Sequence, residues 1–207
     1  MQRPNRIPLF PLDVVLLPTM PLPLHIFEPR YKAMIRRCLE EKIEFGMILA
    51  GEKAVATVGC TAEIVRKLRD YADGRSEILA EGRAVFHLVQ LLDEKEYYEG
   101  TIDYLADEPS PLDAEKESQL VGLFEQCHAH LFGRPWADAG RKEPATLAYR
   151  MASLLPIERM QKQSLLENRS ETSRREFVFN WMKTFLPRLA DRQRTRRRAG
   201  GNGHASN

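Results

Sequence analysis

The sequence predicts an α+β fold, with a closed or folded-over sheet in its first half and packed helices in its second half. Three observations lead to this prediction. Up to about residue 108, short segments rich in Val, Ile, Phe and Tyr alternate with turns that contain Gly and Pro. One amphipathic helical stripe interrupts these segments near residue 30. After Pro111, apolar residues recur at helical spacing.

The first half is predicted to form short strands with local alternation of apolar residues. The segments are LFPL, VVLL, LPLHIF, EFGMILA, ATVGCTAEIVRKL, SEILAEG, AVFHLVQLL and EYYEGTIDYLA. Asp73-Gly74 is a strong hairpin signal between two of them, because glycine tolerates a positive φ. Many short strands joined by frequent turns predict a barrel or a folded-over sheet.

One helix is predicted to begin at Pro29, since proline suits the first turn of a helix. Its apolar stripe at positions i, i+3, i+4, i+7 and i+8 consists of Tyr31, Met34, Ile35, Cys38 and Leu39. Glu28 directly precedes this helix. We expect its carboxylate to bond the free N–H groups of the first turn and to complement the helix dipole.

Four further helices are predicted after Pro111, and helices of this kind can pack as a small bundle. The expected spans are 120–131 with a stop at Gly133, then 147–154, 156–166 and a last helix from about 170. Because proline breaks a helix, we expect the last one to end before Pro187.

The change in pattern at Glu108-Pro109 predicts three parts: a β domain over 1–108, a helical bundle over 109–190 and a basic disordered tail over 191–207. Six arginines and one aspartate lie between Arg188 and Arg198, and the rest of the chain has 25 basic and 28 acidic residues. Nucleic-acid binding would therefore depend on this tail.

The three cysteines, Cys38, Cys60 and Cys127, form no CxxC pair, which favours a reducing compartment and a cytoplasmic protein. The segment Val14 to Phe27 carries no formal charge, but it contains three prolines and is shorter than the roughly 20 residues of a spanning helix. We therefore expect no membrane association.

Two groups of residues invite a chemical interpretation. Cys127, His128 and His130 have the chemistry of zinc ligands, but further ligands have no evident source, so we predict no metal. His25 and Glu28 could be the general-base pair of a small hydrolase, although no motif completes such a site. We predict a packed or hydrogen-bonded His25, no catalytic residue and no cofactor.

A long opening stretch carries a family resemblance. IPLFPLDVVLLPTMPLPLHIFEPRYKAMIRRCLEE, followed by FGMIL, GCTAEI, DGR and YEGTIDYLADE, resembles the N-terminal substrate-binding domain of the Lon protease family over about residues 6–108. The segment LLPIERMQKQSLLE resembles the helices that follow in compact relatives. This resemblance implies a PUA-like pseudo-barrel with one inserted helix, a C-terminal helical bundle and a role in recognising protein substrates.

The resemblance also limits the expected activity. Lon proteases continue into an ATPase module and a protease module with a serine–lysine dyad, and this chain ends before either, so neither activity is carried over. We predict a non-enzymatic module of protein quality control that binds exposed or unfolded polypeptide segments, with a protease or chaperone system as a further partner. The alternative is a nucleic-acid-binding protein that uses its Arg-rich tail.

The predicted peptide contacts lie in two loops. Leu16, Leu17 and Met20 belong to a proline-interrupted connection, which is poor sheet and can remain exposed. The alternative is that these three side chains fill the barrel core. Trp136 lies in a polar loop rich in Gly and Pro, where it is either folded back on the helices or exposed for binding.

Overall fold

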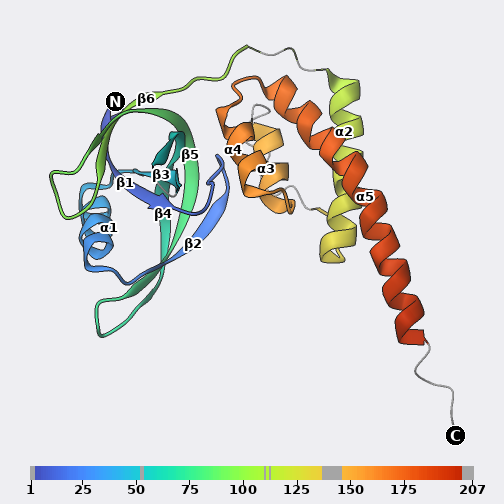
Figure 1. Cartoon of the computed structure of the whole chain (residues 1–207), viewed down its shortest axis with the longest axis horizontal. Helices are drawn as coiled ribbons and strands as arrows, with labels where there is room; N and C mark the ends of the chain where they lie inside the picture. The colour runs from blue at the N-terminus through green and yellow to red at the C-terminus, as the bar shows by residue number, and fades with distance from the viewer. Residues whose placement is uncertain (1–2, 52–53, 110, 112, 137–145, 202–207) are drawn as a thin grey trace, which may run out of the picture. The chain divides into compact units, whose positions relative to one another are not determined.

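The computed structural model describes residues 3–51, 54–109, 111, 113–136 and 146–201, and it describes side chains up to residue 189. In this part of the chain it shows a mixed α+β structure with six strands and five helices (Figure 1). The chain divides into two compact units. The first comprises Met1–Glu108 and Pro156–Arg169, and the second comprises Pro109–Leu155 and Ser170–Asn207.

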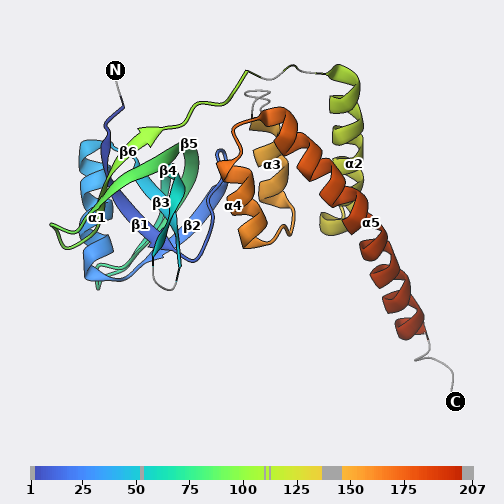
Figure 2. The same cartoon turned by 45° about the horizontal axis from the view of Figure 1, so that its top comes forward.

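The first unit contains a six-stranded sheet that closes on itself. Its strands are β1 (Arg6–Leu12), β2 (Pro21–Ile26), β3 (Phe45–Ala50), β4 (Val55–Asp70), β5 (Ser76–Leu92) and β6 (Glu99–Tyr104). Their order is β2-β5-β4-β3-β1-β6, and β6 pairs again with β5. Strands β1, β3, β4, β5 and β6 therefore form a ring (Figure 2), to which β2 is attached through β5.

The length of β5 makes this closure possible. The part of β5 from Ser76 to Glu81 pairs with β2, and the part from Phe86 to Leu92 pairs with β6. Both partners use the same edge of β5, because β4 occupies the other edge. The sequence predicts two strands that meet near Gly82, but the chain forms one continuous strand there. Gly82 is needed for close approach, since a Cβ atom at this position would lie 2.1 Å from the carbonyl oxygen of Leu17.

Residues 13–20 form a loop rather than the strand predicted for VVLL. The loop ends in a turn in which the N–H of Met20 donates to the oxygen of Leu17 at 3.0 Å. Two bonds hold this turn against β5. The N–H of Thr19 donates to the oxygen of Gly82 at 2.8 Å, and the N–H of Gly82 donates to the oxygen of Met20 at 3.0 Å. The turn thereby sets the position at which β2 begins.

Helix α1 (Pro29–Glu41) has most of the predicted apolar face. Tyr31, Met34, Ile35 and Cys38 are buried, whereas Leu39 is 37% exposed. The predicted capping role of Glu28 is wrong, because its side chain makes no capping bond and accepts instead from Nε of Arg30 at 2.9 Å. The shorter side chains of Ser, Asp and Asn are better suited to reach the N–H groups of a first turn.

The ring encloses a core drawn from four of its strands. Its buried members are Ile7, Leu9, Ile48, Phe86 and Ile102. Because side chains alternate between the two faces of a strand, every second residue of these segments can point inward.

Helix α4 (Arg159–Glu167) belongs to the first unit, although the sequence predicts it as part of a bundle with the other helices. Nε2 of Gln163 donates to the oxygen of Val58 on β4 at 3.1 Å, and Leu165 and Leu166 are buried. Beyond the helix, Arg169 forms an ion pair with Asp107. These contacts connect α4 to the strands, and helical periodicity alone carries no information about such a partner.

The second unit contains α2 (Ala114–Phe132), α3 (Leu147–Leu154) and α5 (Glu171–Gly201). Gly133 ends α2 in the left-handed region at φ 68°, as predicted. The predicted end of the last helix is wrong, because α5 continues through Pro187. Its backbone also covers residues 191–201, which differs from the disordered tail predicted there and agrees with the helix propensity of Arg, Gln and Ala. Residues 202–207 lie outside the described part of the chain.

Among the helices that the structure describes, none combines the length and the apolar character required to cross a membrane.

Candidate functional site

The outer side of β2 carries an exposed apolar stripe. Alternation along the strand turns Leu24 and Ile26 toward the core, where they are 9% and 1% exposed. The alternate residues of the strand, from Pro21 to His25, face outward. Phe27 continues this row, with 57% of its surface exposed. The four exposed residues, called the β2 stripe below, are Pro21, Pro23, His25 and Phe27.

Tyr71, in the connection between β4 and β5, widens this surface. The His25 ring stacks on the Phe27 ring with 5.9 Å between centroids, and the Tyr71 ring meets His25 edge-on at 6.0 Å. The Tyr71 hydroxyl donates to Oε1 of Glu77 at 2.6 Å, a bond that raises the pKa of Tyr71. Three rings and two prolines thus form a patch that suits apolar side chains of a partner.

Charged groups border the aromatic part of this patch. The guanidinium groups of Arg69 and Arg75 lie 4.6 Å and 5.0 Å from the centre of the Tyr71 ring. Oε1 of Glu77 lies 3.8 Å from Nδ1 of His25. An apolar centre with a polar rim is the usual anatomy of a protein-binding surface.

The general-base pair considered for His25 and Glu28 is not formed. The carboxylate next to His25 is that of Glu77, whereas Glu28 bonds Arg30. The turn predicted at Asp73-Gly74 is present, with Gly74 at φ 78° and a bond of 3.0 Å from its N–H to the oxygen of Tyr71.

The four predicted peptide contacts are divided between the two units and differ in exposure. Leu16 and Leu17 are 2% and 0% exposed. The prediction that they remain exposed is therefore wrong, and the alternative, that they fill the core, is correct. Met20 is half-buried where β2 begins. Trp136 belongs to the second unit and is folded back, with its ring edge-on to Phe124 at 4.8 Å.

The residues that suggested zinc chemistry take part in packing. Cys127 is fully buried, and Nδ1 of His128 lies 3.0 Å from the oxygen of Arg134. Within the described ranges, no three His, Cys, Asp or Glu side chains are grouped closely enough to hold a metal ion.

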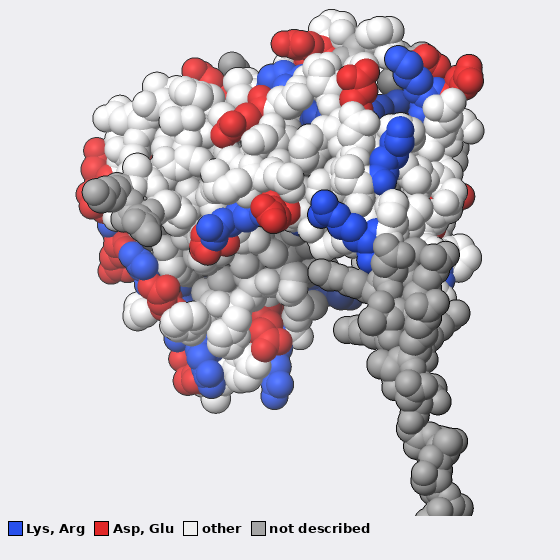
Figure 3. All heavy atoms as spheres, turned by 45° about the vertical axis from the view of Figure 1, so that its right-hand side comes forward, with Lys and Arg blue, Asp and Glu red and all other residues white. Residues whose placement is uncertain are grey.

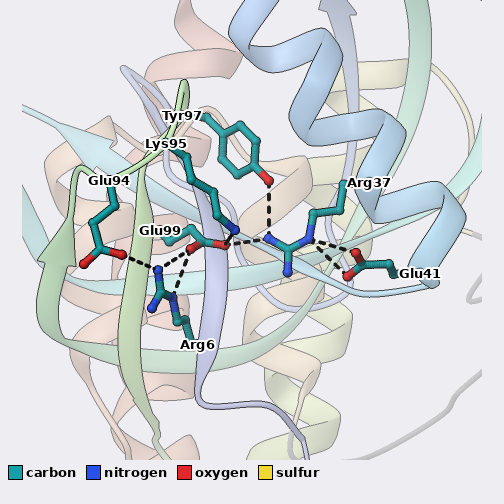
Figure 4. A network of polar contacts seen from close by, with 7 residues as sticks. All are labelled: Arg6, Arg37, Glu41, Glu94, Lys95, Tyr97 and Glu99. Atoms are coloured by element: carbon teal, nitrogen blue, oxygen red, sulfur yellow. Dashed lines mark hydrogen bonds and ion pairs between the residues drawn. The ribbon is translucent and has the colours of Figure 1, made fainter.

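A second polar cluster surrounds Glu99 at the start of β6 (Figure 4). Its carboxylate, 3% exposed, accepts from Arg37 of α1 at 2.5 Å, Arg6 of β1 at 2.7 Å and Lys95 at 2.9 Å. Burial alone would raise the pKa of Glu99, but the three hydrogen bonds outweigh it and lower the pKa to about 2. Because both carboxylate oxygens are engaged, the cluster ties α1 and β1 to β6 and is structural.

The second unit contains a groove of about 430 Å³ between α2 and α5. Leu120 and Phe179 supply apolar lining, and an ion pair of 2.9 Å between Glu117 and Arg175 connects the two helices. The groove could therefore also accommodate an apolar side chain of a bound polypeptide.

Acidic and basic side chains are interspersed on the face shown in Figure 3, where the described residues form no large patch of one sign. A phosphate backbone requires such a basic patch for strong attraction. The predicted nucleic-acid contacts fall on the tail, whose side chains from residue 190 onward lie outside the described part.

Sequence reasoning missed the β2 stripe, although a signal for it was present. In PLPLHIF, Leu or Ile alternates with other residues, which is the pattern typical of a strand with one buried and one exposed face. The contribution of Tyr71 carried no such signal, because it depends on the pairing of β2 with β5.

Comparison with known proteins identifies relatives over most of the chain. Residues 6–184 match the family described as the ATP-dependent protease La (LON) substrate-binding domain. The chain is 28% identical to the Lon protease of Escherichia coli over 218 residues, covering 93% of this chain and 26% of that protein. It is 24% identical to a LON peptidase N-terminal domain and RING finger protein of Schizosaccharomyces pombe, covering 85% of this chain and 44% of that protein.

Solved structures are similar over most of the chain. A Lon N-terminal domain protein from Xanthomonas campestris superposes with a TM-score of 0.68 at 25% identity, covering 86% of this chain and 98% of that one. The N-terminal domain of the Mycobacterium avium complex Lon protease gives 0.63 at 17% identity with the same coverage, which is a likeness of fold. The chain spans about a quarter of the length of the Escherichia coli Lon protease.

Proposed function

This chain belongs to the family of the ATP-dependent protease La (LON) substrate-binding domain, and from this premise we propose that it binds exposed apolar segments of other polypeptides without itself catalysing a reaction. The family predicted from the sequence is confirmed by the match over residues 6–184. The substrate-binding role of the family supports the proposal, and the β2 stripe supplies a surface for it.

We also infer the finer architecture that the resemblance implies. The ring of five strands supports a PUA-like pseudo-barrel for the first unit. The packing of α5 against both α2 and α3 supports a helical bundle for the second unit. The binding surface would then lie on the outside of the barrel, on the strand that is not part of the ring.

The β2 stripe is the observation that carries the proposal. Phe27 is 57% exposed, and the His25 side chain is 43% exposed although it stacks on Phe27. A free aromatic surface of this kind is stabilised when it is covered, at about 25 cal/mol for each Å² of apolar area removed from water. A bound apolar side chain would provide that cover.

The other predicted contacts enter the proposal differently. Met20 directly precedes the stripe and, being half-buried, would contribute a smaller contact. Trp136 stays a proposed contact of the second unit, where a bound segment would have to displace or extend its packing on Phe124. Leu16 and Leu17 would contribute by supporting the loop from within the core. A protease or chaperone system that receives the bound polypeptide is proposed as a further partner.

Fluorescence anisotropy with a labelled, unstructured peptide rich in Leu and Phe tests the proposal. We expect saturable binding by the intact protein, and we expect Phe27→Ser to weaken it by about tenfold, which corresponds to about 1.4 kcal/mol. The matched control is Val89→Ser. Val89 is also an exposed apolar residue, at 55%, but it lies in the half of β5 that pairs with β6. Absence of saturable binding at high micromolar protein, or equal effects of both substitutions, would contradict the proposal.

A further inference from the structure

We propose that the β2 stripe recognises polypeptides by their side chains alone, because Pro21 and Pro23 prevent a bound segment from pairing with β2 as an additional strand. This inference rests on the proposed function and deepens it. It assigns Pro21 and Pro23 as the residues that determine the mode of binding, and it defines the class of segment that is accepted.

The open edge is the starting point. In the strand order of the described sheet β2 stands at one end, with β5 as its neighbour. A strand in this position has one row of backbone groups directed away from the sheet, and such a row is a template for pairing with another chain. Which residues contribute to that row depends on the register.

The register identifies the outward groups. The N–H of Gly82 donates to the oxygen of Met20 at 3.0 Å, and Pro21 lies opposite Glu81. In an antiparallel ladder, pairs that exchange hydrogen bonds alternate with pairs that do not. Because the carbonyl group of Met20 points toward β5, where it accepts from Gly82, positions 22, 24 and 26 also direct their backbone groups toward β5. Positions 21, 23 and 25 direct theirs away from it.

Proline occupies two of these three outward positions. Pro21 and Pro23 have no N–H, so the outer edge of β2 presents three carbonyl groups and a single N–H, that of His25. An added strand needs N–H groups at the same positions to satisfy its own carbonyls. Two of these three donors are replaced by proline rings, so the edge cannot continue the sheet.

The side-chain face stays available. The same residues whose backbone faces outward along the edge place their rings on the exposed face, where Phe27 and Tyr71 join them. A partner is therefore recognised through apolar and aromatic side chains, without a requirement for free N–H groups or an extended backbone. Apolar segments that contain proline, which cannot form a central strand, are accepted as well.

A pair of peptides with identical side chains tests this mode on the intact protein. In the second peptide, ester bonds replace alternate amide bonds of the apolar segment, which removes N–H donors with little change of shape. We expect dissociation constants within about threefold of each other. If the ester peptide binds more than about tenfold more weakly, the proposed function stands and recognition by side chains alone is overturned. If neither peptide binds, both the proposed function and this inference fail.

The double variant Pro21→Thr/Pro23→Thr supplies the complementary test, since it restores both N–H groups in a residue suited to strands. We expect this variant to bind the amide peptide at least about tenfold more tightly than the ester peptide. We also expect it to self-associate in sedimentation velocity, because two free edges can pair. His25→Thr is the matched control, which changes a neighbouring side chain and keeps both prolines. Its dissociation constants for the amide peptide and the ester peptide should remain within about threefold of each other. The role of the prolines would be overturned by a double variant that folds, remains monomeric and binds the amide and ester peptides with similar dissociation constants.

Discussion

At Thr19 the backbone has a φ of 66°, a left-handed conformation that β-branched residues rarely adopt. Thr19 follows Pro18 in the turn closed by Leu17 and Met20, at a position where type II turns favour glycine or asparagine. Its hydroxyl is also buried, and it makes no hydrogen bond within the described residues. Thr19 therefore stores strain at the point where β2 is fastened to Gly82.

Replacing Thr19 should release this strain. We expect Thr19→Gly to raise the free energy of unfolding by about 1 kcal/mol, because glycine adopts positive φ without steric conflict. Thr19→Ala removes the unbonded hydroxyl and retains a Cβ atom, so its gain should be smaller. Urea unfolding followed by circular dichroism measures both, and a loss of stability in Thr19→Gly would contradict the strain.

Glu99 provides a prediction of pH dependence. Its pKa in the folded protein is lowered to about 2 from an ordinary value of 4.5, so its contribution to stability is complete above pH 4.5 and is lost as the pH falls toward 2. Glu99→Gln should lower the free energy of unfolding by about 2 kcal/mol at pH 7. The difference between the two proteins should shrink between about pH 5 and pH 2.

Chemical unfolding at several pH values provides the measurement. The control is Glu94→Gln. Glu94 bonds Arg6 at 2.8 Å, but 64% of its side chain is exposed, so its removal should have a much smaller effect. A constant difference between Glu99→Gln and the unmodified protein from pH 7 to pH 2 would rule out the proposed titration.

The elements of the first unit depend on a few positions where two segments approach closely. Strand β5 continues through Gly82, and the loop that ends in Met20 is bonded to it there. Both the placement of β2 and the orientation of its outward residues follow from this contact. The exposed stripe is therefore a consequence of how the loop is fastened, and not only of the alternation in PLPLHIF.

Two glycines should respond in opposite ways to the same change. Gly82→Ala would place a Cβ atom 2.1 Å from a backbone oxygen, and we expect it to lower the free energy of unfolding by about 3 kcal/mol. Gly122, inside α2, borders open space, and a Cβ atom added there would meet no atom within 4 Å. Gly122→Ala should therefore raise the free energy of unfolding by about 0.5 to 1 kcal/mol. Thermal unfolding of both variants measures the effect, and similar shifts of the midpoint temperature in the two variants would contradict the close approach at Gly82.

At the scale of the whole molecule, each of the two units is built from two separate segments of the chain. Residues 156–169 return to the first unit after α3, and α5 then belongs to the second unit. A boundary drawn at Glu108 therefore separates β4 from α4, whose Gln163 bonds the oxygen of Val58. The first unit is discontinuous in sequence.

A chain that ends at residue 108 should consequently be less stable than one in which a flexible Gly-Ser linker joins residues 1–108 to 156–169. We expect the linked chain to require more urea for unfolding, because α4 covers apolar surface of the strands and satisfies the oxygen of Val58. The same linked chain with Gln163→Ala and Leu166→Ser is the control, and it should lose the gain. Equal urea midpoints for all three chains would show that α4 does not stabilise the first unit.

The family, the α+β class and the existence of most elements could be predicted from the sequence, because hydrophobic period and turn chemistry are local properties of the chain. It placed the start of α1 at Pro29 and the end of α2 at Gly133 for the same reason. The burial of Leu16 and Leu17, the exposure of Pro21 and Phe27 and the packing of α4 on the strands follow from tertiary contacts and could not be predicted from the sequence. These outcomes depend on which segments become neighbours, and burial is a property of the neighbours as much as of the residue itself.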